Sequence, residues 1–342
     1  MDFFVPLKGS TAPSFAAATL VLPQPSLASL AQLACDLIVH NYRLDLVGYL
    51  ALSDHVPAVG ARDRLPGQDA QHGIALGCEV YATPSRSLFI ALPRSPVIRA
   101  RRANYLESMQ RWVAESGFKE VLIVAGADAA MRGDDGLNAI TPLRHLVPTA
   151  PNSTSPSPST ASPLFTSLRR ISPSYLSTAP SGFQTASEAA AADAEGAHVP
   201  PIPHGGLARP LLTTLAGLDS DGDGDGAPGS EPAPAAADNV GALIVYTSEG
   251  AASESAHFLA DALAYLLEAQ LADLEDRIER APPAHTTTAG VESREGRGEG
   301  AAVEEVQQGS EKGNVRWKEP VSWERGLLGP ELARDAGMDM YG

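Results

Sequence analysis

The sequence predicts a three-layer α/β/α sandwich around a mostly parallel, partly mixed sheet, with long disordered insertions. Two observations support this fold class. The segments KEVLIVAG (119–126) and GALIVYTS (241–248) are almost continuously apolar, which is typical of strands buried on both faces. Amphipathic helical patterns alternate with such strands along the chain, so helices are expected to cover both faces of the sheet.

The first elements follow from their periodicity. Strands are predicted over 18–23 and 44–52, and a helix over 26–40 with Ser26 as its N-cap. The residues that share the apolar face of this helix are Leu27, Leu30, Ala31, Ala34, Leu37 and Ile38. Segments 77–84 and 87–93 predict two strands around a Pro84-Ser85-Arg86 turn, so part of the sheet should be antiparallel.

The later elements continue the alternation. A helix is predicted over 97–116, ended by Gly117, and another begins near Gly206. Ser253 opens a long helix. The inward positions of these three helices are Leu106, Met109, Trp112 and Val113, then Leu207, Leu211, Leu212 and Leu215, and finally Leu259, Leu263, Leu266, Leu267, Leu274 and Ile278.

Three segments have compositions too polar or too rich in Pro, Gly and Ser to bury a core, and we expect them to be disordered. The predicted organisation is one α/β domain made of 1–148 and 198–280, a low-complexity insertion 149–197, an acidic Gly/Pro-rich loop 219–238, a disordered linker 281–313 and a C-terminal docking segment 314–342.

Composition limits the function classes. The formal net charge of −16 argues against a nucleic-acid binder, which needs a basic face. The sequence has no apolar run long enough for a membrane span, and its N-terminus, with Asp2 and Pro6, makes a poor signal peptide. Cys35 and Cys78 are expected to be buried thiols in a reducing compartment. We therefore expect the cytoplasm or the nucleus, with no nucleic-acid or membrane partner.

A catalytic set is not apparent, so we predict no catalytic residue, no metal ligand and no cofactor. The phosphate-binding, dinucleotide, nucleophile-elbow and zinc motifs are missing. The stretch DSDGDGDG (219–226) mimics a calcium loop but has Ser230 at its twelfth position, so a flexible acidic insertion is favoured. Gly205-Gly206 before a helix either cradles an anion or makes a tight turn, and the tight turn is favoured.

Four arginines gather in RSPVIRARR, within an acidic chain. One interpretation is a solvated helix start, and the other is a contact patch for an acidic partner surface. The four residues are Arg94, Arg99, Arg101 and Arg102.

Taken in order, these segments resemble the proteasome assembly chaperone 2 family. The resemblance starts at FFVPLKG and runs through APSFAAATLVLPQPSLASLAQLACDLIV, LDLVGYLALSDHVPAVG, CEVYATPSRSLFIALPRSP, WVAESGFKEVLIVAGA, TPLRHLVP, IPHGGLARPLL, GALIVYTSEGAASESAHFLADALAYLLE and WKEPVSWERGLLGPELA. It implies a non-catalytic chaperone of 20S proteasome assembly that forms a heterodimer with proteasome assembly chaperone 1 and promotes formation of the α-ring. The insertions are longer than the family pattern requires.

The sequence closes on Met340, Tyr341 and Gly342, which match the hydrophobic–Tyr–X tail of proteins that dock on the proteasome α subunits. The resemblance implies that the terminal carboxylate pairs with a pocket lysine between adjacent α subunits and that the Tyr ring packs against the pocket wall. Trp317 and Trp323 are predicted to anchor the preceding segment to the domain as support residues.

Two other hypotheses stay open at this point. A small-molecule enzyme of nucleoside-phosphorylase-like or hydrolase type would need a pocket at the carboxyl ends of the strands, with convergent polar groups near Gly205-Gly206. A scaffold would bind partners through its low-complexity insertions.

Overall fold

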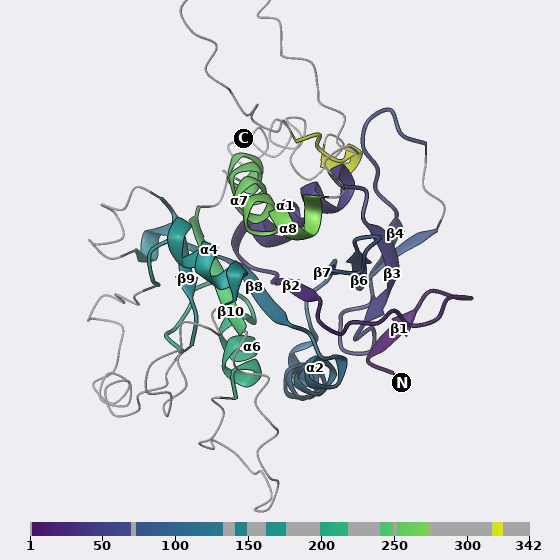
Figure 1. Ribbon diagram of the computed structural model, residues 1–342, viewed down its shortest axis with the longest axis horizontal. Coiled ribbons are helices and arrows are strands. Elements are labelled where there is room, and N and C mark those ends of the chain that lie inside the picture. Colours follow the sequence, from purple (N-terminus) through teal and green to yellow (C-terminus); the bar gives the residue numbers. More distant parts are fainter. Residues whose placement is uncertain are drawn as a thin grey trace, which may run out of the picture.

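The computed structural model describes residues 2–69, 73–132, 141–148, 162–175, 199–217, 240–248, 252–272, 274 and 317–323. Within these residues the chain forms a mixed eight-stranded sheet between two helical layers (Figure 1). The predicted α/β/α sandwich is thereby confirmed.

The strands of the sheet stand in the order β1-β3-β6-β7-β2-β8-β10-β9. Their bounds are β1 Phe4–Pro6, β2 Thr19–Pro23, β3 Asp45–Leu50, β6 Cys78–Ala82, β7 Leu88–Pro93, β8 Glu120–Asp128, β9 Leu143–Leu146 and β10 Val240–Thr247. The central strands β7, β2, β8 and β10 are parallel neighbours, and the remaining pairings are antiparallel. The sequence indicated one antiparallel hairpin, which is present as β6 and β7. The sheet has more antiparallel pairings than this one hairpin.

The helical layers form two separate cores. The helices are α1 Leu30–Asn41, α2 Arg102–Ser116, α4 Pro163–Ile171, α6 Ala208–Leu215, α7 Ala252–Leu266 and α8 Glu268–Leu271, with 3-10 turns η1 Leu27–Ser29, η2 Arg99–Arg101 and η3 Ala129–Met131. One core lies between the sheet and α1, α4, α7 and α8, and the other between the sheet and α2 and α6 (Figure 1). A small ribbon of β4 (Val59–Ala61) and β5 (Ile74–Leu76) lies outside the main sheet.

The start of the first helix differs from the prediction. Ala28 and Ser29 have φ values of 56° and 53°, so the chain turns through η1 and the α-helix begins only at Leu30. Ser26 caps no helix with its side chain. Its Oγ instead accepts a hydrogen bond of 2.8 Å from the backbone N–H of Gly126, which ties the β2–α1 turn to β8.

A folded segment lies inside the region expected to be a low-complexity insertion. Residues 162–175 contain α4, whose N-cap Ser162 accepts from the Phe165 N–H and whose first residue is Pro163. Leu164, Phe165 and Leu168 are buried in the core under α7. The physical reason is that this short stretch carries an amphipathic face, which its Ser- and Pro-rich surroundings obscure.

Candidate functional site

The C-terminal segment 317–323 is held against the α1–α7 layer (Figure 1). Trp317 is buried among core residues, and its Nε1 donates a 2.7 Å hydrogen bond to Asp261 Oδ1 on α7. Its ring lies 6.1 Å from that of Tyr42, which follows α1. The indole therefore fixes the segment by both burial and a charge-assisted hydrogen bond.

Backbone hydrogen bonds fix the same segment. The Asn41 side chain donates to the Lys318 carbonyl and accepts from the Lys318 N–H, each at 3.0 Å. The Val321 N–H donates to the Arg64 carbonyl at 2.9 Å. The Asn41 side chain thus supplies hydrogen-bond partners to backbone groups of a segment that pairs with no strand.

A polar cluster completes the attachment, which we call the C-terminal anchor (residues 317–323). Glu319 Oε1 accepts from Ser253 Oγ at 2.7 Å and lies 3.1 Å from His257 Nε2. The ring of Trp323 stacks on His257 at 6.4 Å, and Trp323 is buried. Trp323 is the last residue of this segment that the structure describes. The predicted docking residues Met340, Tyr341 and Gly342 lie outside the described residues.

The four arginines separate into two groups. Arg94, at the end of β7, donates through Nη1 to both carboxylate oxygens of Asp36, at 2.7 and 2.8 Å. Its Nε donates to Glu79 Oε2 at 3.0 Å, and the Tyr81 hydroxyl donates to the same oxygen. Because Asp36 and Glu79 are buried, Arg94 neutralises two carboxylates within the chain.

The other three arginines lie exposed at the start of α2, and we call them the arginine patch (Arg99, Arg101, Arg102). Arg101 donates to the buried Asp54 at 3.1 Å. Neither Arg99 nor Arg102 forms an ion pair within the described residues, and the first turn of α2 carries no acidic side chain. Cations at a helix N-terminus oppose the helix dipole. The patch is therefore suited to an acidic partner surface.

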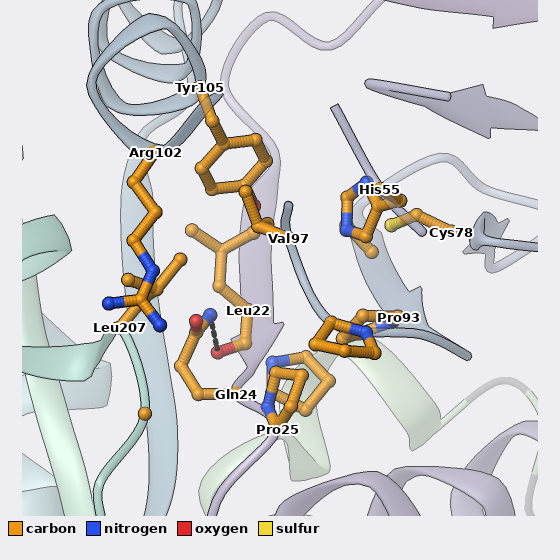
Figure 2. A pocket seen from close by; sticks show the side chains of 14 residues that line it. Leu22, Gln24, Pro25, His55, Cys78, Pro93, Val97, Arg102, Tyr105 and Leu207 are labelled. Carbon is orange, nitrogen blue, oxygen red and sulfur yellow. Dashed lines mark hydrogen bonds between the residues drawn. The ribbon is translucent and has the colours of Figure 1, made fainter. Parts of the chain in front are cut away.

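A pocket opens where the topology of the sheet changes direction. The parallel strands β2 and β7 are followed by α1 and α2, which lie on opposite faces of the sheet, and ligands in α/β proteins bind at such points. The cavity measures about 80 Å³, and Figure 2 shows it from close by. Its walls are mainly apolar and include four prolines, namely Pro23, Pro25, Pro93 and Pro96.

Gly206 closes one side of this pocket. Its φ is +65°, and a Cβ there would lie 2.1 Å from the carbonyl oxygen of Pro25. This close approach supports the tight-turn interpretation of Gly205-Gly206, because only glycine lets the start of α6 lie so near the end of β2.

The pocket is also lined by His55 and Tyr105, which the sequence analysis did not single out, and by Cys78, which is buried as expected. His55 Nδ1 donates to the Ala51 carbonyl at 3.0 Å, and burial lowers the pKa of His55. Burial raises the pKa values of the Cys78 thiol and the Tyr105 hydroxyl well above their usual ranges. The thiol is therefore protonated at neutral pH and poorly suited to act as a nucleophile.

Other sites considered from the sequence have the following outcomes. The calcium-like stretch 219–226 lies outside the described residues. Within the described part of the chain, His, Cys, Asp and Glu side chains nowhere gather in threes as a metal ion would require. Of the helices that the structure describes, none has the length and apolar character needed to cross a membrane.

Comparison with known proteins adds independent information. Proteasome assembly chaperone 2 of Homo sapiens is 32% identical over 144 residues, which is 42% of this chain and 54% of that protein. The Nematostella vectensis protein of the same name is 32% identical over 136 residues, 39% of this chain and 54% of that protein. The chain thus matches about half the length of these relatives.

Among solved structures, Pyrococcus furiosus PbaA, an archaeal homolog of proteasome-assembly chaperone, aligns with a TM-score of 0.45 and 11% identity, covering 79% of this chain and 92% of that one. The family model named PAC2 matches residues 20–278, from β2 to beyond α8 and hence most of the chain. The chain therefore belongs to the PAC2 family.

Proposed function

We propose that the chain is a non-catalytic chaperone of 20S proteasome assembly. It pairs with proteasome assembly chaperone 1, promotes formation of the α-ring and docks on α subunits through Met340, Tyr341 and Gly342. Membership of the PAC2 family supports the chaperone role, as do relatives named for proteasome assembly. We place its action in the cytoplasm or the nucleus.

The observation that best supports tail docking is the C-terminal anchor. It fixes the chain to the domain at Trp323 through Trp317, Asn41 and Glu319. Nineteen residues follow, and a chain of that length spans at most about 65 Å when fully extended. A terminal group tethered to a fixed point gains effective concentration at a nearby pocket once the domain itself touches the ring.

The arginine patch offers the domain a second contact. It lies on the α2 layer, whereas the C-terminal anchor lies on the opposite α1–α7 layer. The two features can therefore address different partner surfaces. We propose that Arg99, Arg101 and Arg102 contact an acidic surface of a partner. Arg94 instead forms ion pairs with Asp36 and Glu79 inside the chain.

The test is deletion of residues 340–342 in the full chain, co-expressed with proteasome assembly chaperone 1. Burying one Tyr side chain is worth about 1.5–3 kcal/mol, so the deletion should weaken α-ring binding by roughly 10- to 100-fold. The heterodimer itself should be unchanged. Met338→Ala is the matched control, because it removes a nearby apolar side chain outside the last three residues. Equal ring binding by the deleted and complete chains would refute tail docking.

A further inference from the structure

The pocket beside β2 and β7 contains two polar groups that the fold leaves without a partner. His55 and Tyr105 are 2% and 5% exposed, and both line the cavity. Their rings meet edge to face at 5.6 Å and are turned toward the pocket in Figure 2. Among the described residues, nothing bonds to His55 Nε2 or to the Tyr105 hydroxyl. Both groups line the pocket, where water or a bound molecule can pair with them.

The tautomer of His55 determines whether its Nε2 atom donates or accepts a hydrogen bond. A carbonyl oxygen can only accept, so Nδ1, at 3.0 Å from the Ala51 carbonyl, carries the proton. Nε2 of the neutral ring is then a hydrogen-bond acceptor. The Tyr105 hydroxyl beside it can donate. A ligand hydroxyl can satisfy both groups at once, donating to His55 and accepting from Tyr105.

The opposite side of the pocket is positive. Figure 2 shows Arg102 across the cavity from His55, with Leu22 and Val97 between them. Arg102 forms no ion pair in the part of the chain that the structure describes. A ligand that spans the pocket therefore meets a cation at one end, an apolar middle and a neutral hydrogen-bonding pair at the other end.

The cavity measures about 80 Å³ and has room for a small organic molecule rather than for a single water only. We propose that the pocket is a binding site for a small hydroxycarboxylate, with the hydroxyl between His55 and Tyr105 and the carboxylate at Arg102. The site shares Arg102 with the arginine patch, so the binding experiment uses the chain without its protein partners.

The experiment is a titration of the full-length chain with β-hydroxypropionate, followed by saturation-transfer NMR on the ligand. Propionate lacks the hydroxyl, and the corresponding propane diol lacks the charge. Each should bind at least about threefold more weakly, as expected for loss of one modest polar interaction. Tyr105→Phe keeps the ring and should weaken β-hydroxypropionate by about fivefold. Arg102→Gln should weaken it by about threefold.

Arg111→Gln is the matched control, because Arg111 is an exposed arginine of the same helix that lies outside the pocket. It should leave binding unchanged. The proposal is overturned when the wild-type chain gives no saturation transfer, when propionate and the diol bind as well as β-hydroxypropionate, or when Arg111→Gln weakens binding as much as Arg102→Gln. The ligand comparison uses only the wild-type chain, so it decides the question even if a variant fails to fold.

Discussion

Replacing Arg94 with Met tests the division of the arginines into two groups. The side chain of Arg94 is 24% exposed and binds Asp36 through two short hydrogen bonds and Glu79 through a third. Methionine keeps most of the aliphatic volume but removes the positive charge. Two carboxylates, 8% and 0% exposed, then remain in the interior without their cation.

The magnitude follows from this geometry. Removing one partner of a buried ion pair costs about 3–5 kcal/mol, because the remaining charge is left uncompensated. Glu79 keeps only the hydrogen bond from Tyr81, and its Oε1 already has no partner in the described structure. An exposed arginine without an ion pair, such as Arg99, should contribute within about 0.5 kcal/mol of zero.

Urea unfolding of the full chain, followed by circular dichroism, measures both variants. Arg94→Met should lower the midpoint strongly with an unchanged slope, and Arg99→Met should not. The triple replacement Asp36→Asn, Glu79→Gln, Arg94→Met should recover part of the loss, because the buried charges are removed together. If Arg94→Met is as stable as Arg99→Met, then Arg94 is free to contact a partner and the division of the cluster is wrong.

Three further predictions concern the rest of the domain. Phe165→Ala should lower the free energy of unfolding, measured in urea, by about 3–5 kcal/mol, because Phe165 is 3% exposed. A loss below about 1 kcal/mol would mean that the segment around Phe165 does not pack on the core, as the sequence analysis expected of the insertion. Gly206→Ala should lower the melting temperature more than Gly9→Ala. Both glycines have positive φ, but of the two only Gly206 would place a Cβ within 4 Å of other backbone atoms. Equal decreases in melting temperature would contradict the close contact with Pro25. Burial lowers the pKa values of His40 and His55 from 6.5, so the unfolded chain binds protons that the folded chain excludes. The free energy of unfolding should therefore fall as the pH drops below about 6.5, and a His55→Gln variant with an undiminished slope would contradict this.

Much of the fold could be predicted because its central strands are buried on both faces. Segments 119–126 and 241–248 have no polar alternation, and they form the neighbouring parallel strands β8 and β10, neither of which is an edge strand. The edge strands were harder to find. Strand β9 is four residues long and contains Arg144 and His145, so its pattern resembles a loop. Helix α4 was missed because composition was judged over a window much longer than the helix itself.

The candidate site could be predicted only in part. Arg94 and Arg99 look alike in sequence, and their different roles depend on Asp36 and Glu79, which come from other elements. The anchor depends on the hydrogen bonds between Asn41 and Lys318, which lie 277 residues apart in the sequence. No local pattern identifies such a pair, because the contact exists only after α1 and the C-terminal segment pack together.

The most direct test of the chaperone account is a reconstitution with purified components. The full chain is mixed with proteasome assembly chaperone 1, the complex is sized by sedimentation, and α subunits are then added while ring formation is followed over time. The account predicts a stable heterodimer that accelerates ring formation and stays bound to the ring. Two proteins that sediment separately and leave the rate of ring formation unchanged would contradict it.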